Sequence, residues 1–229
     1  MSDRVKRIGF PPKQGLYDPA NEKESCGVGF VANMKGVPSH QNVLDALEML
    51  GNMEHRGGCG CEPNTGDGAG ILVGLPETFL RNVAKDDLGV DLPEKGCFGA
   101  GLVFLPKLES ERQKCIAAVE TIIFEQGQQC LGWREVPAET DAANVGPAAR
   151  AAEPYIMQLF IGAAEGFGGD DFERQLYVIR KRASHQLRFD ENLTERLLFY
   201  ICSLSTKVMI YKGMLNTEQV TQYYTDLAR

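Results

Sequence analysis

The sequence predicts a single domain that mixes α-helices with β-strands. Its 229 residues are 43% hydrophobic, which is enough to bury one substantial core. Short apolar runs typical of buried strands alternate with segments whose apolar residues recur every three or four positions, as on one face of a helix. The sequence contains no internal repeat and no apolar stretch long enough to span a membrane. These observations favour one compact domain over a repeat array or a membrane protein.

The charge of the chain indicates what kind of ligand to expect. The formal net charge is -7 at pH 7, and Lys and Arg form no dense stripe. We therefore expect neither nucleic acid nor an anionic membrane as the main partner, and we favour a small ligand. The first 25 residues lack the continuous apolar segment of a secretory signal, which predicts a cytoplasmic protein.

Residues 1–25 are polar and contain prolines, glycines and a charged run at 21–24. We expect them to form an irregular leader rather than part of the core. The composition changes abruptly at Cys26, where the apolar segment 26–33 is predicted to be a buried strand. A removable propeptide has such a boundary, although an ordinary polar terminus has the same composition.

The thiol of Cys26 stands at this boundary and is the candidate nucleophile. A thiol has a reference pKa of about 8.5 and an α-amine one of about 7.7 to 8.0. If the bond before Cys26 is cut, the new amine can therefore accept the proton of the thiol without a histidine. One residue would then supply both nucleophile and base. The alternative is an ordinary half-buried cysteine.

The other cysteines indicate neither a disulfide framework nor a clear metal site. Their total of seven is odd, and the chain has no secretory signal. Cys59 and Cys61 are close enough in sequence to suggest a metal site, but only His55 could join them. We therefore expect no metal in this chain. The seven are Cys26, Cys59, Cys61, Cys97, Cys115, Cys130 and Cys202.

The first predicted helix follows a turn at 35–38. Apolar residues at spacings of four, three and three indicate an amphipathic helix, and Ser39 is a candidate N-cap. The residues on the apolar face are Val43, Leu47, Leu50 and Met53.

Arg56 follows this helix and precedes two glycines. A guanidinium at a helix end can bind a carboxylate through two parallel hydrogen bonds, so Arg56 is a candidate substrate contact. The alternative is a surface arginine in a helix-terminating turn.

The segment 64–70 contains three glycines and leads into the apolar run 71–73. The spacing of these glycines does not fit G-x-G-x-x-G, and they precede a strand instead of opening a helix. We therefore expect a tight turn with close backbone packing rather than a phosphate site.

Further strands are predicted at 98–105, 155–161, 197–202 and 208–211. Two helices are expected between them, one opened by Ser110 with Gln113 and ended by Gly127, the other opened by Asp170 with Glu173. A last helix is expected from Asn216. Residues 137–153 show no clear period and are expected to form a surface loop.

Taken together, four stretches resemble the N-terminal glutamine amidotransferase domain of the glutamate synthase large chain. They are Cys26–Phe30, His55–Gly57, Cys59–Gly70 and Tyr211–Leu215. The resemblance runs from about Tyr17 to the end. It implies an α+β protein with the four-layer αββα fold of the N-terminal-nucleophile (Ntn) hydrolases, with residues 1–25 as propeptide and 26–229 as the amidotransferase domain.

The resemblance also implies a reaction. Cys26 attacks the carboxamide carbon of glutamine, Arg56 holds the α-carboxylate, and the released ammonia is combined with 2-oxoglutarate to make glutamate. FMN and an iron–sulfur cluster are implied for downstream synthase domains of the same polypeptide, with a small subunit or ferredoxin as electron donor. No cofactor is implied for this part of the chain.

The sequence departs from the family pattern at one point. No Asn-Gly dipeptide occurs in the 229 residues, and the family uses such a pair to bind the oxyanion. We therefore expect the chain to be the N-terminal part of the domain, truncated at its C-terminal end and incomplete for turnover. Two other interpretations remain open: a non-catalytic regulatory or assembly module, and a metal or redox module built on Cys59 and Cys61.

Overall fold

The computed structural model describes residues 12–16, 18, 26–57 and 62–229. Most of the predicted leader, and both Cys59 and Cys61, lie outside the described residues.

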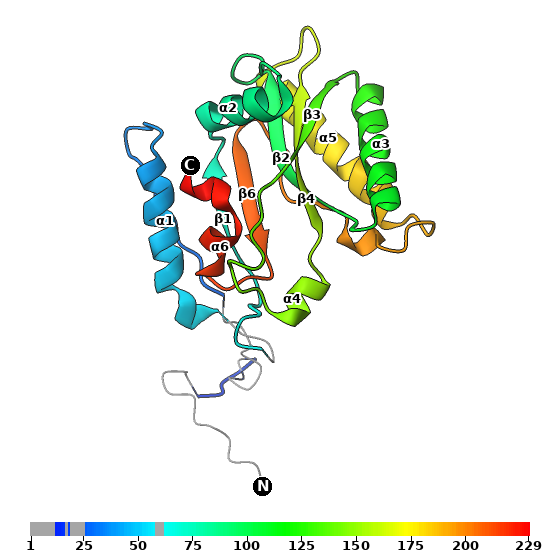
Figure 1. Ribbon diagram of the computed structural model, residues 1–229. Helices are drawn as coiled ribbons and strands as arrows, with labels where there is room; N and C mark the ends of the chain where they lie inside the picture. The colour runs from blue at the N-terminus through cyan, green and yellow to red at the C-terminus, as the bar shows by residue number, and fades with distance from the viewer. Residues whose placement is uncertain (1–11, 17, 19–25, 58–61) are drawn as a thin grey trace.

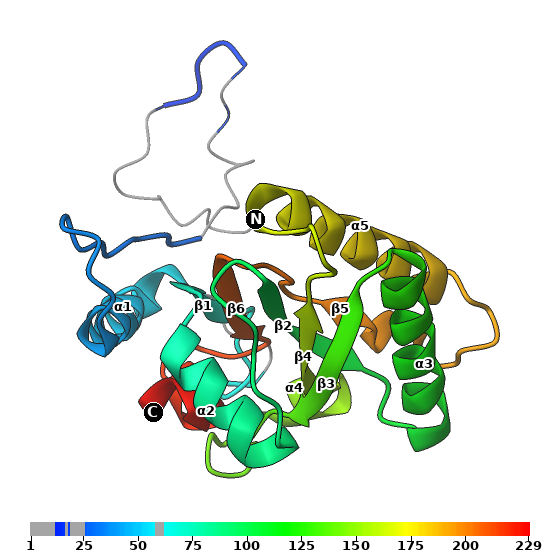
Figure 2. The same cartoon turned by 90° about the horizontal axis from the view of Figure 1, so that it is seen from above.

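Two antiparallel sheets are stacked between helices (Figure 1). The larger sheet has the strand order β3-β4-β2-β5, and the smaller one pairs β1 with β6. Helices α3 and α5 cover the outer face of the larger sheet, and α1 lies beside the smaller sheet, as Figure 2 shows from a second direction. This arrangement confirms the predicted α+β class and its αββα layers.

The elements have the following bounds. The strands are β1 (Ala69–Gly74), β2 (Phe98–Leu105), β3 (Gln129–Glu135), β4 (Tyr155–Gly162), β5 (Tyr200–Ile201) and β6 (Val208–Gly213). The helices are α1 (His40–Asn52), α2 (Glu77–Leu88), α3 (Glu109–Glu125), α4 (Pro147–Ala151), α5 (Gly169–Arg188) and α6 (Gln219–Tyr223). Three 3₁₀ turns complete them: η1 (Glu54–Arg56), η2 (Arg196–Leu198) and η3 (Thr225–Ala228).

Strand β2 separates the two halves of the core. Because successive side chains of a strand point to opposite faces, Ala100 and Leu102 enter the core between the sheets, while Val103 and Leu105 pack under α3 and α5. Because both faces of β2 are covered, its sequence is a continuous apolar run. The predicted bounds of this strand, 98–105, therefore agree with the structure.

Helix α1 forms as predicted. Ser39 caps it, since its hydroxyl oxygen accepts a hydrogen bond from the backbone N–H of Gln41 at 3.1 Å. Val43, Leu47 and Leu50 pack against the core between the sheets. These contacts fix the helix that leads to Arg56.

The prediction of a buried strand at 26–33 is wrong. The segment is extended but exposed, with Val28 at 94% and Phe30 at 88% of full exposure. A strand within a sheet needs a hydrogen-bonded neighbour, and no strand pair among the described residues includes this segment. Its apolar composition therefore did not determine its burial.

Other differences concern elements with weak patterns. Neither α2 nor β3 was predicted, and β3 is a sheet edge with a bulge between Cys130 and Gly132. The expected strand at 197–202 contains two residues of η2 and two residues of β5, and Leu197 is exposed. The expected surface loop at 137–153 contains α4 and buries Val145 and Ala149.

Neither predicted capping box forms: the N-cap residues are Leu108 for α3 and Gly168 for α5, and neither makes a side-chain cap. At α5 the acidic side chains of the predicted box make tertiary contacts instead. The Glu173 carboxylate accepts hydrogen bonds from Ser205 at 2.6 Å and from Thr206, which ties α5 to the loop before β6. The predicted stop at Gly127 is confirmed, with a left-handed φ of 71°. At the last helix, Asn216 and Gln219 exchange two hydrogen bonds of 2.9 Å between side chains and backbone N–H groups.

A buried ion pair joins four elements. Arg134 of β3 donates two hydrogen bonds to Asp226 of η3, at 2.7 and 2.9 Å, and one to Asp87 of α2 at 2.5 Å. It also donates to Gln158 of β4 at 3.3 Å. Burial disfavours the charged guanidinium, but these carboxylates outweigh burial and hold the pKa of Arg134 above its usual value.

Arg134→Met should destabilise the chain by about 3–5 kcal/mol, because Asp226, whose side chain is 0% exposed, would keep a buried charge without its bidentate partner. Urea-induced unfolding followed by circular dichroism measures this. The matched control is Arg174→Met, which removes an exposed ion pair with Asp171 and should cost no more than about 1 kcal/mol. Equal losses in the two variants would contradict the importance of the buried pair.

Candidate active site

The structure brings the two predicted site residues together. Cys26 and Arg56 are 30 positions apart, yet Nη2 of the Arg56 guanidinium donates a hydrogen bond to the backbone oxygen of Cys26 at 3.3 Å. Both residues are exposed. A guanidinium has five N–H donors, so the contact with Cys26 leaves donors for a ligand carboxylate.

Two glycines allow this approach. A Cβ at Gly27 would lie 3.0 Å from Cβ of Arg56 and 3.3 Å from Sδ of Met53. A Cβ at Gly29 would lie 2.5 Å from Sδ of Met49 on α1. The alternating glycines after Cys26 therefore let the segment lie against the end of α1 and against η1.

What Cys26 can do chemically depends on its backbone nitrogen. While the bond to Ser25 is intact, this nitrogen belongs to an amide and cannot act as a base. If that bond were cut, the nitrogen would become an α-amine on the same residue as the thiol, and proton transfer between them would need no second side chain.

The glycine-rich turn packs as expected, by close contact between backbones. A Cβ at Gly66 would lie 2.5 Å from the backbone nitrogen of Asn216, and one at Gly70 would lie 2.7 Å from Cβ of Lys212. Gly70 pairs with Lys212 in the β1–β6 ladder. Contacts with β6 and with the residues that follow it therefore fix the position of the turn.

Sequence reasoning missed the side chains that hold this turn. The Glu62 carboxylate accepts hydrogen bonds from Thr65 at 2.7 Å and from the N–H of Ala148 at 3.1 Å, and these bonds lower the pKa of Glu62. Gln219 donates from Nε2 to the backbone oxygens of Asn64 and Ala143 at 3.0 and 3.1 Å. Glu62 lies within the stretch 59–70, one of the four that resemble the family, and this was the only indication in the sequence that Glu62 has a role.

The described residues contain no group of three or more His, Cys, Asp or Glu side chains that could hold a metal ion. Cys59 and Cys61 fall outside them, so the metal or redox alternative stays a hypothesis. Within the described part of the chain, every helix is too short or too polar to cross a bilayer.

Comparison with known proteins identifies the class. Residues 26–229 match the family model of class-II glutamine amidotransferases. The match begins at Cys26, and it covers most of the chain. The chain belongs to this family.

The similar proteins within this class are glutamate synthases. The chain is 43% identical over 219 residues to the glutamate synthase [NADPH] large chain of Bacillus subtilis, covering 95% of this chain and 14% of that protein. It is 41% identical to glutamate synthase [NADH] of Saccharomyces cerevisiae, covering 95% of this chain and 10% of that protein. It is 40% identical to ferredoxin-dependent glutamate synthase 1 of Arabidopsis thaliana, covering 95% of this chain and 13% of that protein. The chain thus spans a small part of the length of these relatives.

Gly70→Ala should destabilise the chain by about 1–3 kcal/mol, because its Cβ would collide with the backbone oxygen of Tyr211 and with Lys212. Gly74→Ala is the matched control in the same strand. Its Cβ would meet nothing within 4 Å, so we expect no loss of stability or a small gain. Both are measured by urea unfolding, and similar midpoints for the two variants would contradict the close packing of β1 on β6.

Proposed function

We propose that this chain is part of the glutamine-hydrolysing domain of a glutamate synthase, whose ammonia is combined with 2-oxoglutarate to form glutamate. The observation that carries the proposal is the position of Cys26. The family match begins at this residue, its thiol is exposed, and the guanidinium of Arg56 lies against its backbone.

The proposed reaction begins after the bond between Ser25 and Cys26 is cut. The α-amine of Cys26 takes the proton of the thiol, and the thiolate attacks the carboxamide carbon of glutamine. The tetrahedral intermediate collapses with loss of ammonia, which receives the proton held by the amine. Water then attacks the thioester, releasing glutamate and restoring the thiol.

Arg56 is proposed to bind the α-carboxylate of glutamine. Two observations support this role: Arg56 has N–H donors that are not used by Cys26, and it lies beside Cys26. Because the carboxylate and the carboxamide of glutamine are only a few bonds apart, a group that binds the carboxylate must lie close to the residue that attacks the carboxamide. The same contact with the backbone of Cys26 could instead serve only to position the nucleophile. The two roles predict different kinetics.

The rest of the assignment belongs to the complete enzyme. Residues 1–25 are proposed to be the propeptide and 26–229 the amidotransferase domain. FMN, an iron–sulfur cluster and the synthase domains are proposed partners in the same polypeptide, and the cytoplasm is the proposed compartment. The names of the relatives include NADPH, NADH and ferredoxin, so similarity over this region does not distinguish the electron donor.

Cys26→Ser in a complete enzyme should lower glutamine-dependent synthesis by several orders of magnitude, because the nucleophile is lost. Synthesis from added ammonia should continue, since it bypasses the thioester. Both rates are measured as glutamate formed from 2-oxoglutarate. The control is Cys97→Ser, a half-buried thiol outside the proposed site, which should leave both rates unchanged. Equal loss of the two activities in Cys26→Ser would instead indicate damage to the fold, and equal retention would favour the non-catalytic module.

Arg56→Lys keeps the charge but loses the planar pair of donors. We expect the KM for glutamine to rise about tenfold or more, matching a loss of about 1.5–3 kcal/mol of charged hydrogen bonding. Steady-state kinetics with glutamine and with ammonia measure this. An unchanged KM with a lower kcat would rule out the carboxylate contact and assign Arg56 to positioning Cys26.

A further inference from the structure

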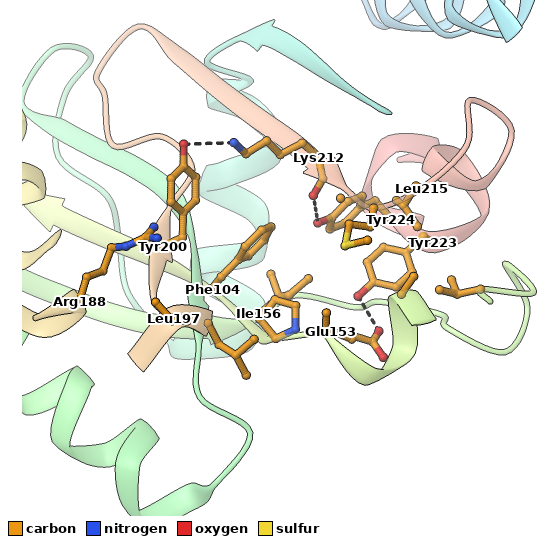
Figure 3. A pocket seen from close by; sticks show the side chains of 17 residues that line it. Phe104, Glu153, Ile156, Arg188, Leu197, Tyr200, Lys212, Leu215, Tyr223 and Tyr224 are labelled. Atoms are coloured by element: carbon orange, nitrogen blue, oxygen red, sulfur yellow. Dashed lines mark hydrogen bonds between the residues drawn. The ribbon is translucent and has the colours of Figure 1, made fainter. Parts of the chain in front are cut away.

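A pocket of about 400 Å³ lies away from the candidate active site (Figure 3). Neither Cys26 nor Arg56 lines it. Its walls come from β2, β4, β6, α4, α6, the end of α5 and the segment 197–200, so it lies beside the core between the two sheets. Its volume lies within the range of small-molecule sites.

The middle of the pocket is apolar. Phe104, Ile156 and Leu197 form adjoining parts of its wall, as Figure 3 shows. Leu197 is 73% exposed, a large apolar side chain at the mouth of a concave surface. Such a wall favours a ligand with a hydrophobic body.

Two cations line the pocket together with this wall. Lys212 donates a hydrogen bond from Nζ to the Tyr200 hydroxyl at 3.1 Å, and the same Nζ lies 4.2 Å from the centre of the Tyr200 ring. Arg188, the last residue of α5, also lines the pocket. Across the described part of the chain, neither cation has a carboxylate within 4.0 Å. Both are half-buried.

The acidic residue of the pocket does not neutralise them. Glu153 stands on the opposite side and accepts hydrogen bonds from the hydroxyls of Tyr223 at 2.7 Å and Thr140 at 2.5 Å. Burial, followed by this carboxylate, raises the pKa of Tyr223, so the phenol keeps the proton that it donates. Glu153 is therefore already bound by two neutral donors within the protein.

We propose that this pocket binds a small organic carboxylate with an apolar body. The carboxylate pairs with Lys212 and Arg188, and the body lies on Phe104, Ile156 and Leu197. A free inorganic anion would leave the apolar wall in water, and an amine would meet two like charges. A neutral apolar molecule would remove water from both cations without replacing it. A carboxylate attached to a hydrophobic body pairs with the cations of the pocket and also covers its apolar wall.

The position of the pocket brings this ligand close to the segment that supports the glycine-rich turn. Leu215 lines the pocket, and the peptide after Leu215 is the one against which Gly66 packs. A bound ligand would therefore contact the segment that supports the glycine-rich turn.

The test is calorimetric titration of the purified 229-residue chain with 3-phenylpropionate, using 3-phenylpropanamide as the neutral analogue. We expect the acid to bind at least about tenfold more tightly than the amide, because the neutral amide cannot form a charged hydrogen-bonded pair with the cations of the pocket. Lys212→Met and Arg188→Met should each weaken the acid by a similar factor and leave the amide unchanged. Glutamine at saturating concentration should not compete, because it is proposed to bind at Cys26.

The control variants distinguish this site from general charge effects. Lys181→Met removes an exposed cation of α5 that does not line the pocket, and it should leave binding unchanged. Lys212→Arg should retain binding, which separates loss of charge from loss of fold if Lys212→Met proves unstable. Equal affinity for acid and amide, no binding of either, or equal weakening by Lys181→Met and Lys212→Met would each overturn the proposal.

Discussion

One buried guanidinium connects the end of the chain to the candidate active site. Arg134 fixes η3 through Asp226, since charges buried so deeply are stable only while they are paired. The backbone oxygen of Leu227 in η3 then accepts a hydrogen bond from Nε2 of His40 at 2.9 Å, at the first residue of α1. Helix α1 leads in turn to Arg56, which meets Cys26. The position of Cys26 thus depends in part on an ion pair between Arg134 of β3 and Asp226, which is 92 positions further along the chain.

A second constraint is the close approach of backbones. Gly27 and Gly29 let the nucleophile segment lie on α1, and Gly66 and Gly70 let the glycine-rich turn and β1 lie on β6. Two of the stretches that carry the family resemblance, 26–30 and 59–70, therefore contain glycines placed by packing. Residues 66–70 of the second contact the stretch 211–215 directly. Part of the family signature consequently reflects how the site is supported rather than the reaction itself.

The proposed active site and the proposed carboxylate pocket use different chemistry. At Cys26 the thiol and the neighbouring guanidinium of Arg56 are exposed, and the proposed reaction depends on a backbone nitrogen that cleavage would convert to an amine. In the pocket, Lys212 and Arg188 lie beside an apolar wall, without carboxylate partners among the described residues.

The sequence by itself determined the strongly patterned elements and the class of protein. Ser39 and the apolar stripe of α1 are local features, and β2 is apolar on both faces, so no distant contact was needed to predict them. Four short stretches, 26–30, 55–57, 59–70 and 211–215, were together sufficient to indicate the family. Only the tertiary structure decided where Glu173 and Arg134 bind, because each pairs with residues far along the chain. It also decided that segment 26–33 is exposed, since burial of a strand depends on a neighbour that its own composition does not specify.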